Sequence, residues 1–151
     1  MNLTQKESGL LTDMKGQEEL CIKKYKYYAS SAKAPELRAM FENMQRIEES
    51  HLQSICGLMN GSLSAPPDKI ENSNNDYCKV ANYMNEEDKN SDSFMCQDML
   101  ASEKHASALY DTAIFEFKDP TARKMLNHIQ AEEQQHGEQI YAYMSMNGMY
   151  N

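Results

Sequence analysis

One stretch of this sequence occurs twice. Residues 35–53 read PELRAMFENMQRIEESHLQ, and residues 120–138, which lie 85 positions later, read PTARKMLNHIQAEEQQHGE. Each copy begins with proline and carries a Glu-x-x-His motif, Glu48 with His51 and Glu133 with His136. Around each motif, apolar residues recur at spacings of three and four, as on one face of an α-helix. Because proline fits the first turn of a helix, a helix is predicted to begin at each copy.

The repeat also extends upstream of these two helices. The same shift of 85 pairs Glu18 with Glu103 and Tyr25 with Tyr110. Each repeat unit therefore predicts two helices joined by a short turn, and such a pair packs as an antiparallel hairpin. The first unit covers about residues 10–60, with its first helix from Leu10 or somewhat earlier to Lys33. The second unit covers about residues 94–148.

Local signals mark the ends of the predicted helices. Asn60-Gly61 and Asn147-Gly148 are typical of helix C-termini. Asp119 is a candidate N-cap for the last helix. Residues 61–93 are polar and form the predicted crossover, although a short helix at about residues 77–84 stays open. A crossover of this length can run along the whole bundle, so that the third helix starts at the same end as the first.

These elements predict an all-α fold. The expected architecture is a ferritin-like antiparallel four-helix bundle made of two repeated helix hairpins joined by a long crossover. All 151 residues are expected to form a single domain, which is long enough to bury a core without disulfides.

Composition narrows the classes of function. The net charge is −8 and the pI is about 5.0, which argues against a nucleic-acid partner. No apolar run approaches about 18 residues, so no membrane span is predicted. The polar first nine residues do not resemble a signal peptide, which favours an intracellular location. The four cysteines form no CxxC pair, and we expect reduced thiols at Cys21, Cys56, Cys78 and Cys96.

Six polar residues interrupt the apolar stripes of the predicted helices. They are Glu18, Glu48, His51, Glu103, Glu133 and His136. Burying an unpaired carboxylate costs several kcal/mol, and four carboxylates in one core would repel one another. Since no lysine or arginine shares these stripes, another source of positive charge is expected.

Helix geometry predicts that the six side chains meet. Glu18 lies 16 residues before the turn near residue 34, while Glu48 lies 14 and His51 17 residues after it. At about 1.5 Å per residue, Glu18 and Glu48 differ in depth by only about 3 Å. The same relation holds in the second repeat unit. Carboxylate and imidazole together suit iron, manganese or zinc, and two divalent ions would balance four glutamates.

Two alternatives remain at this point. The six residues could lie on the surface if the helix phases are wrong, or the site could keep its shape without binding metal.

Tyr25 and Tyr110 could donate hydrogen bonds to the metal ligands, or they could be ordinary core tyrosines. His128 and Glu132 could add a ligand. For these two, as for Glu19, Glu49 and His105, a solvated helix face is expected.

Five segments of the second repeat unit are similar to those of a known family. They are Asp98-Met-Leu-Ala-Ser-Glu-Lys-His105, Tyr110-Asp-Thr-Ala113, Asp119-Pro120, Glu132-Glu133 and Asn147-Gly-Met-Tyr150. These segments resemble the Coat F domain of bacterial spore coat proteins. Helices of the first unit match only through the repeat. This resemblance implies a ferritin-like fold and a location in the mother-cell cytoplasm and the spore coat, with other coat proteins as partners.

The Glu-x-x-His motifs also resemble those of rubrerythrin and manganese catalase. That resemblance implies that Glu18, Glu48, His51, Glu103, Glu133 and His136 hold two transition-metal ions, iron or manganese. The chain lacks the paired CxxC motifs of a rubredoxin module, so reductase chemistry would need an external electron donor. Bundles of this kind often form homodimers.

Three functions follow as hypotheses. The first is a purely structural spore coat protein without bound metal. The second is a di-metal oxidoreductase of peroxidase, catalase or ferroxidase type. The third is a helical adaptor without chemistry, which would leave the six inward polar residues unexplained.

Overall fold

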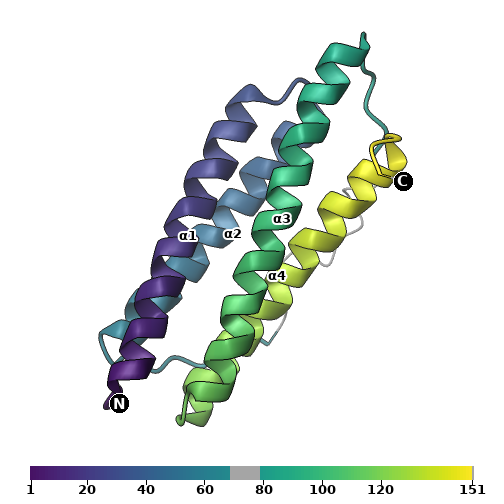
Figure 1. Cartoon of the computed structure of the whole chain (residues 1–151). Coiled ribbons are helices and arrows are strands. Elements are labelled where there is room, and N and C mark those ends of the chain that lie inside the picture. Colours follow the sequence, from purple (N-terminus) through teal and green to yellow (C-terminus); the bar gives the residue numbers. More distant parts are fainter. Residues whose placement is uncertain (69–78, 151) are drawn as a thin grey trace.

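Four helices form the fold in the computed structural model, which describes residues 1–68 and 79–150 (Figure 1). They are α1 (Gln5–Ser31), α2 (Pro35–Met59), α3 (Glu86–Glu116) and α4 (Pro120–Met146). The described residues contain no β-strand. The prediction of an all-α bundle is therefore confirmed.

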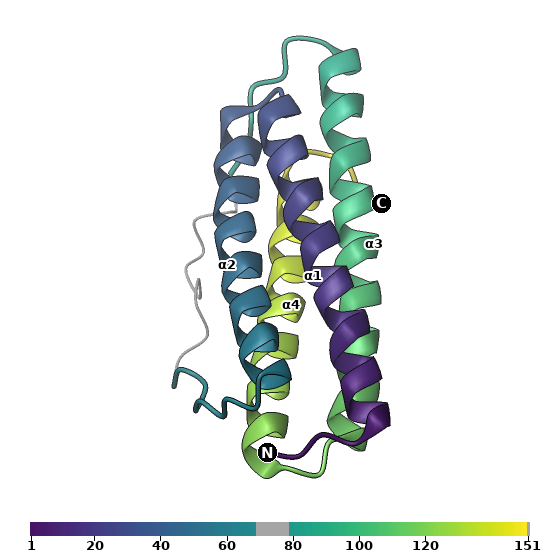
Figure 2. The same cartoon turned by 90° about the vertical axis from the view of Figure 1, so that its left-hand side faces the viewer.

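The helices lie side by side with their axes nearly aligned (Figures 1 and 2). α1 packs mainly on α2, α3 packs mainly on α4, and α1 also lies beside α3. α3 begins near the turn between α1 and α2, at the opposite end of the bundle from the start of α1 (Figure 1). The expectation that α3 starts at the same end as α1 was wrong. Because α2 brings the chain back to the start of α1, a full-length crossover must end at the opposite end.

The third helix begins earlier than predicted, and the first begins before Leu10, an earlier start that the prediction allowed. Thr4 and Glu7 form a capping box that starts α1, in which each side chain accepts a hydrogen bond from the other residue's backbone. Asn85 caps α3 by accepting from the backbone of Asp88. α3 therefore begins at Glu86 rather than near residue 94, and the crossover is shorter than expected.

The other predicted helix boundaries agree with the structure. Pro35 and Pro120 occupy the first positions of α2 and α4, and Asp119 accepts hydrogen bonds from the backbone of the first turn of α4. Gly61 and Gly148 follow α2 and α4 with φ of 78° and 64°, a backbone conformation that favours glycine. Of the short helix left open at residues 77–84, positions 77 and 78 lie outside the described residues and 79–84 are not helical.

Two buried acids join the repeat units at the ends of the bundle. Asp92 of α3 accepts hydrogen bonds from the backbone N–H groups of Lys33 and Ala34, in the turn of the first unit. Its repeat counterpart Glu7 accepts from the backbone of Lys118, in the turn of the second unit. The turn of each hairpin is thus held by the first helix of the other hairpin.

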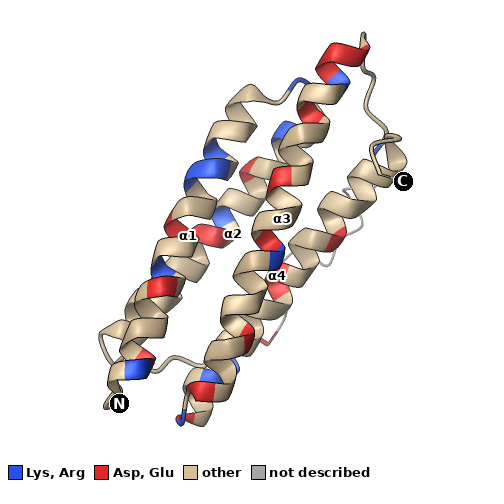
Figure 3. Cartoon of the chain, in the orientation of Figure 1, with Lys and Arg blue, Asp and Glu red and all other residues tan. Residues whose placement is uncertain are grey.

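The core consists of two apolar clusters. One includes Phe41, Met44 and Met99, and the other includes Leu11, Leu126 and Ile129. Lysine and acidic residues are interspersed along α1, whereas acidic residues outnumber lysines on α3 (Figure 3). Cys21, Cys56 and Cys96 carry free thiols, as predicted, whereas Cys78 lies outside the described residues.

No helix among the described residues combines the length and the apolar character needed to cross a bilayer.

Candidate metal centre

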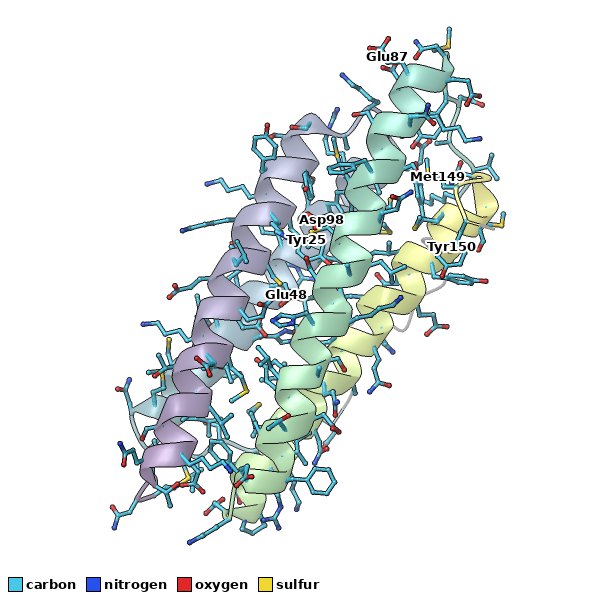
Figure 4. All side chains as sticks on the ribbon, in the orientation of Figure 1. Tyr25, Glu48, Glu87, Asp98, Met149 and Tyr150 are labelled. Carbon is cyan, nitrogen blue, oxygen red and sulfur yellow. The ribbon has the colours of Figure 1, made fainter. Side chains whose placement is uncertain are left out.

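The six interrupting residues lie inside the bundle. Their side chains come from all four helices, and no residue of the set is more than 2% exposed. Figure 4 shows Glu48 enclosed between the helices, about midway along the bundle. The alternative that these residues lie on the surface is therefore wrong.

The candidate ligands fall into two overlapping groups. One group contains Glu18 and His51, and the other contains Glu103 and His136, while Glu48 and Glu133 belong to both. Within each group, one possible ligand atom from every residue lies within 4.8 Å of the others. Glu48 and Glu133 are therefore common to both groups of possible metal ligands.

The two histidines occupy equivalent places in this arrangement. His136 Nδ1 lies 3.0 Å from a carboxylate oxygen of Glu48 and 3.1 Å from one of Glu103. His51 Nδ1 lies 3.2 Å from Glu133, 3.3 Å from Glu48 and 3.8 Å from Glu18. Each histidine thus contacts the glutamate of the other Glu-x-x-His motif. The candidate centre therefore needs side chains from both repeat units.

The tyrosines also contact the opposite repeat unit. Tyr110 Oη donates a hydrogen bond of 2.6 Å to Glu18, and Tyr25 Oη donates one to Glu103. Both tyrosines are fully buried. They therefore satisfy both alternatives, because they are core residues whose hydroxyl groups orient the candidate ligands. Figure 4 shows Tyr25 and Glu48 in the interior of the bundle.

Glu132 and His128 do not lie on a solvated face, which corrects the prediction for these two residues. Glu132 is 5% exposed, and its Oε1 lies 3.0 Å from both His51 Nε2 and His128 Nε2. The repeat offered a signal for this burial, since the counterpart of Glu132 is the core residue Ile47. The predicted exposure is confirmed for Glu19, Glu49 and His105.

Two of the four glutamates are favoured as carboxylates. Burial alone would raise the pKa of Glu18, but hydrogen bonds involving Glu48, His51 and Tyr110 lower it to about 2. Burial also opposes ionisation of Glu103. There the charge of His136, the nearby carboxyl group of Glu133 and the hydrogen bonds to His136 and Tyr25 outweigh it and hold the pKa below the usual value.

The two shared glutamates behave in the opposite way. Burial and the charges of Glu18 and Glu103 raise the pKa of Glu48 to about 8. Burial and the neighbouring carboxylates raise the pKa of Glu133 well above its usual value. Crowding of four acids therefore favours protons on the shared pair when no cation neutralises them.

When no cation is bound, both histidines are favoured in the charged imidazolium form. Burial would lower the pKa of His136, but the charge and hydrogen bond of Glu103, together with Glu48, raise it to about 10. Burial is likewise outweighed at His51, where the charge of Glu48 and the close carboxylates of Glu132, Glu133 and Glu18 raise the pKa well above its usual value. Without a bound cation, protons on the histidines and on the shared glutamates therefore offset the negative charge of the centre.

The donor set fits transition-metal ions. Among the described residues, Glu18 Oε2, Glu103 Oε2 and Glu133 Oε2 are buried oxygen atoms without a hydrogen-bond partner. Such atoms are costly unless a donor or a cation satisfies them. Carboxylate oxygens combined with imidazole nitrogens suit iron, manganese or zinc.

Comparison with known proteins points to one family. Residues 91–151 match the family model described as the Coat F domain. This match covers most of α3, all of α4 and the residues that follow α4, which is less than half of the chain. It contains the segments on which the resemblance to this domain was based, and it supports that resemblance for the second repeat unit. The comparisons with curated proteins and with solved structures gave no match.

Proposed function

We propose that the chain is a spore coat F-like protein of ferritin-like fold that holds two iron or manganese ions and acts on peroxide or oxygen. The overlap of the two ligand groups at Glu48 and Glu133 is the observation that carries the metal part of this proposal. Placement in the spore coat rests on the Coat F match of the second repeat unit.

Each of the two proposed ions would have its own glutamate and histidine ligands. Glu18 and His51 would hold one ion, Glu103 and His136 the other, and the shared glutamates would contact both. When bound, iron or manganese would supply the electron transfer needed to reduce oxygen, or to reduce or oxidise peroxide.

Neighbouring groups would keep the ligands in place. The hydroxyl groups of Tyr25 and Tyr110 hold one oxygen of Glu103 and one of Glu18, which leaves the other oxygen of each carboxylate for an ion. Glu132 accepts from Nε2 of His51 and so turns Nδ1 of that ring toward the cluster. These side chains are almost fully buried, and such surroundings strengthen their hydrogen bonds.

The test is metal content measured by elemental analysis. The wild-type protein should bind about two iron or manganese ions per chain. Replacing both shared glutamates, Glu48→Ala with Glu133→Ala, should abolish binding at both positions. The control replaces two exposed glutamates, Glu19→Ala with Glu42→Ala, and should leave the metal content unchanged. A metal-loaded protein that is inactive toward peroxide and toward Fe(II) oxidation would contradict the redox part of the proposal.

A second candidate function is a purely structural spore coat protein without bound metal, which the Coat F match favours independently of the cluster. Absence of metal in the wild-type protein, with unchanged or higher stability in the double variant, would favour this alternative. Homodimers and contacts with other coat proteins fit either function, and sedimentation of the purified protein tests self-association.

A further inference from the structure

A groove between α3 and α4 opens beside the metal centre. It has a volume of about 670 Å³, and the candidate ligands Glu103 and Glu133 form part of its lining. Both side chains are at least nine-tenths buried, and each carries an Oε2 atom without a hydrogen-bond partner among the described residues. The groove therefore extends from the surface to two glutamates of the candidate centre, each of which carries a buried oxygen atom without a partner.

Small residues create the space in this groove. Ser107 on α3 and Gly137 on α4 line it. Their repeat counterparts are the larger, half-buried residues Ile22 and Leu52 on α1 and α2. A Cβ atom added at Gly137 would meet only the Leu100 side chain, at 3.8 Å, so the space beside this residue is open.

The rim of the groove is acidic. Asp111 and Glu138 line it together with a single cation, Lys104. In the first repeat unit the counterparts of the two acids are Lys26 and Gln53. Open space and negative charge thus occur together on the α3–α4 side, whereas the equivalent positions on α1 and α2 carry larger side chains and no acid. A divalent cation is attracted by such a rim and by the carboxylates below it.

We propose that the α3–α4 groove is the route by which divalent metal ions enter the centre. This inference rests on the proposed function, since it presumes that the centre binds metal. Asp111 and Glu138 attract the hydrated ion, the space beside Ser107 and Gly137 admits it, and Glu103 and Glu133 receive it.

A smaller cavity offers the competing route. It has a volume of about 70 Å³ and lies between α2 and α4, next to His51, Ser54 and His128. There the contact of Glu132 with His51 and His128 already occupies the polar groups that would receive an ion. The lining of the larger groove instead includes two glutamates that each carry an oxygen atom without a partner among the described residues.

The experiment measures the rate of metal loading separately from its extent. Metal-free protein is mixed rapidly with Co²⁺, and the visible absorption of the bound ion is followed in time. Gly137→Leu fills the groove with the side chain found at the repeat counterpart. It should slow loading by about tenfold, because entry then requires displacement of a side chain. The final amount of bound Co²⁺ should stay unchanged. Gly9→Leu, on an exposed face of α1 with nothing within 4 Å, is the matched control and should load at the wild-type rate.

A charge variant tests the rim independently. Asp111→Asn with Glu138→Gln should slow loading by about threefold to tenfold at low ionic strength, with the difference fading at high salt. Glu42→Gln, an exposed glutamate on α2, is the control and should change nothing.

Each outcome decides the inference. Slower loading of the groove variants at unchanged final stoichiometry supports it. Wild-type rates in both groove variants would overturn it, as would slow loading of Ser54→Leu alone, which would place entry at the smaller cavity. A wild-type protein that binds no Co²⁺, iron or manganese at equilibrium would overturn the proposed function, and this inference with it. That failure is recognised because the extent of binding is lost rather than its rate.

Discussion

The metal-free protein should become less stable as the pH rises from about 5 to about 8, because the centre holds protons that the unfolded chain releases. Burial and the charges of Glu18 and Glu103 raise the pKa of Glu48 to about 8 from an ordinary value of 4.5. Glu103 and Glu48 raise the pKa of His136 to about 10, against the effect of burial. Between the ordinary and the raised values, the folded chain binds more protons than the unfolded chain, so each pH increase favours unfolding.

The size of this effect follows from the shifts. Each pKa unit corresponds to ~1.4 kcal/mol, so Glu48 alone removes on the order of 4 kcal/mol across this range. His136 adds to the loss above its ordinary value of 6.5. Glu18 acts in the opposite sense. Its pKa is lowered to about 2, so its contribution is present above the ordinary value of 4.5 and is lost as the pH falls toward 2. The metal-free protein should therefore be most stable near pH ~5.

Urea unfolding followed by far-UV circular dichroism measures this dependence. Chelator-treated wild-type protein should unfold at a clearly lower urea concentration at the upper pH than at the lower one. Glu48→Gln, which keeps a neutral side chain at all pH values, should show a smaller change, whereas the exposed-site control Glu42→Gln should behave like the wild type. Equal midpoints across the range in metal-free wild-type protein would refute the reasoning, because they would mean that the buried groups do not retain their protons.

Three further predictions concern the centre and the ends of the bundle. Loading the protein with two divalent ions near neutral pH should release about four protons, two from the shared glutamates and two from the histidines. Calorimetry in buffers of different ionisation enthalpy measures this number, and release of less than one proton would contradict the protonation described above. Glu132→Ala removes the acceptor at His51 Nε2 and should weaken metal binding by about 10- to 100-fold while two ions still bind at saturation. Unchanged affinity in a competition titration, with exposed Glu49→Ala as control, would show that Glu132 does not orient the ring. Asp92→Ala leaves two backbone N–H groups of the first hairpin turn without acceptors and should cost about 2–4 kcal/mol in the free energy of unfolding. A loss no larger than that of Glu42→Ala would contradict the view that this acid holds the turn.

Local sequence signals explain which helix boundaries could be predicted. Proline at the start of α2 and α4 and glycine after their ends have local conformational effects, so those boundaries could be read from neighbouring residues. The start of α3 was missed, and that of α1 was left open, because their caps, Asn85 and Thr4, precede polar turns that carry no apolar periodicity. Hydrophobic patterning detects a helix only where one face is buried.

What the sequence determined by itself is the set of residues that must face inward at one depth. Spacing along a helix decides which face carries a side chain, and the rise per residue decides how far it lies from a turn. The positions of Glu18, Glu48 and His51 in the chain are therefore sufficient to place the three side chains together.

Only the tertiary structure decided which partner each of these groups meets. Tyr25 reaches Glu103 and Tyr110 reaches Glu18, so the hydrogen bonds connect the two repeat units rather than closing within one. The burial of Glu132 and the groove beside Gly137 likewise depend on how far α3 and α4 lie apart and how each is rotated about its axis. Those quantities result from the packing of all side chains between helices, and a periodicity within one helix does not contain them.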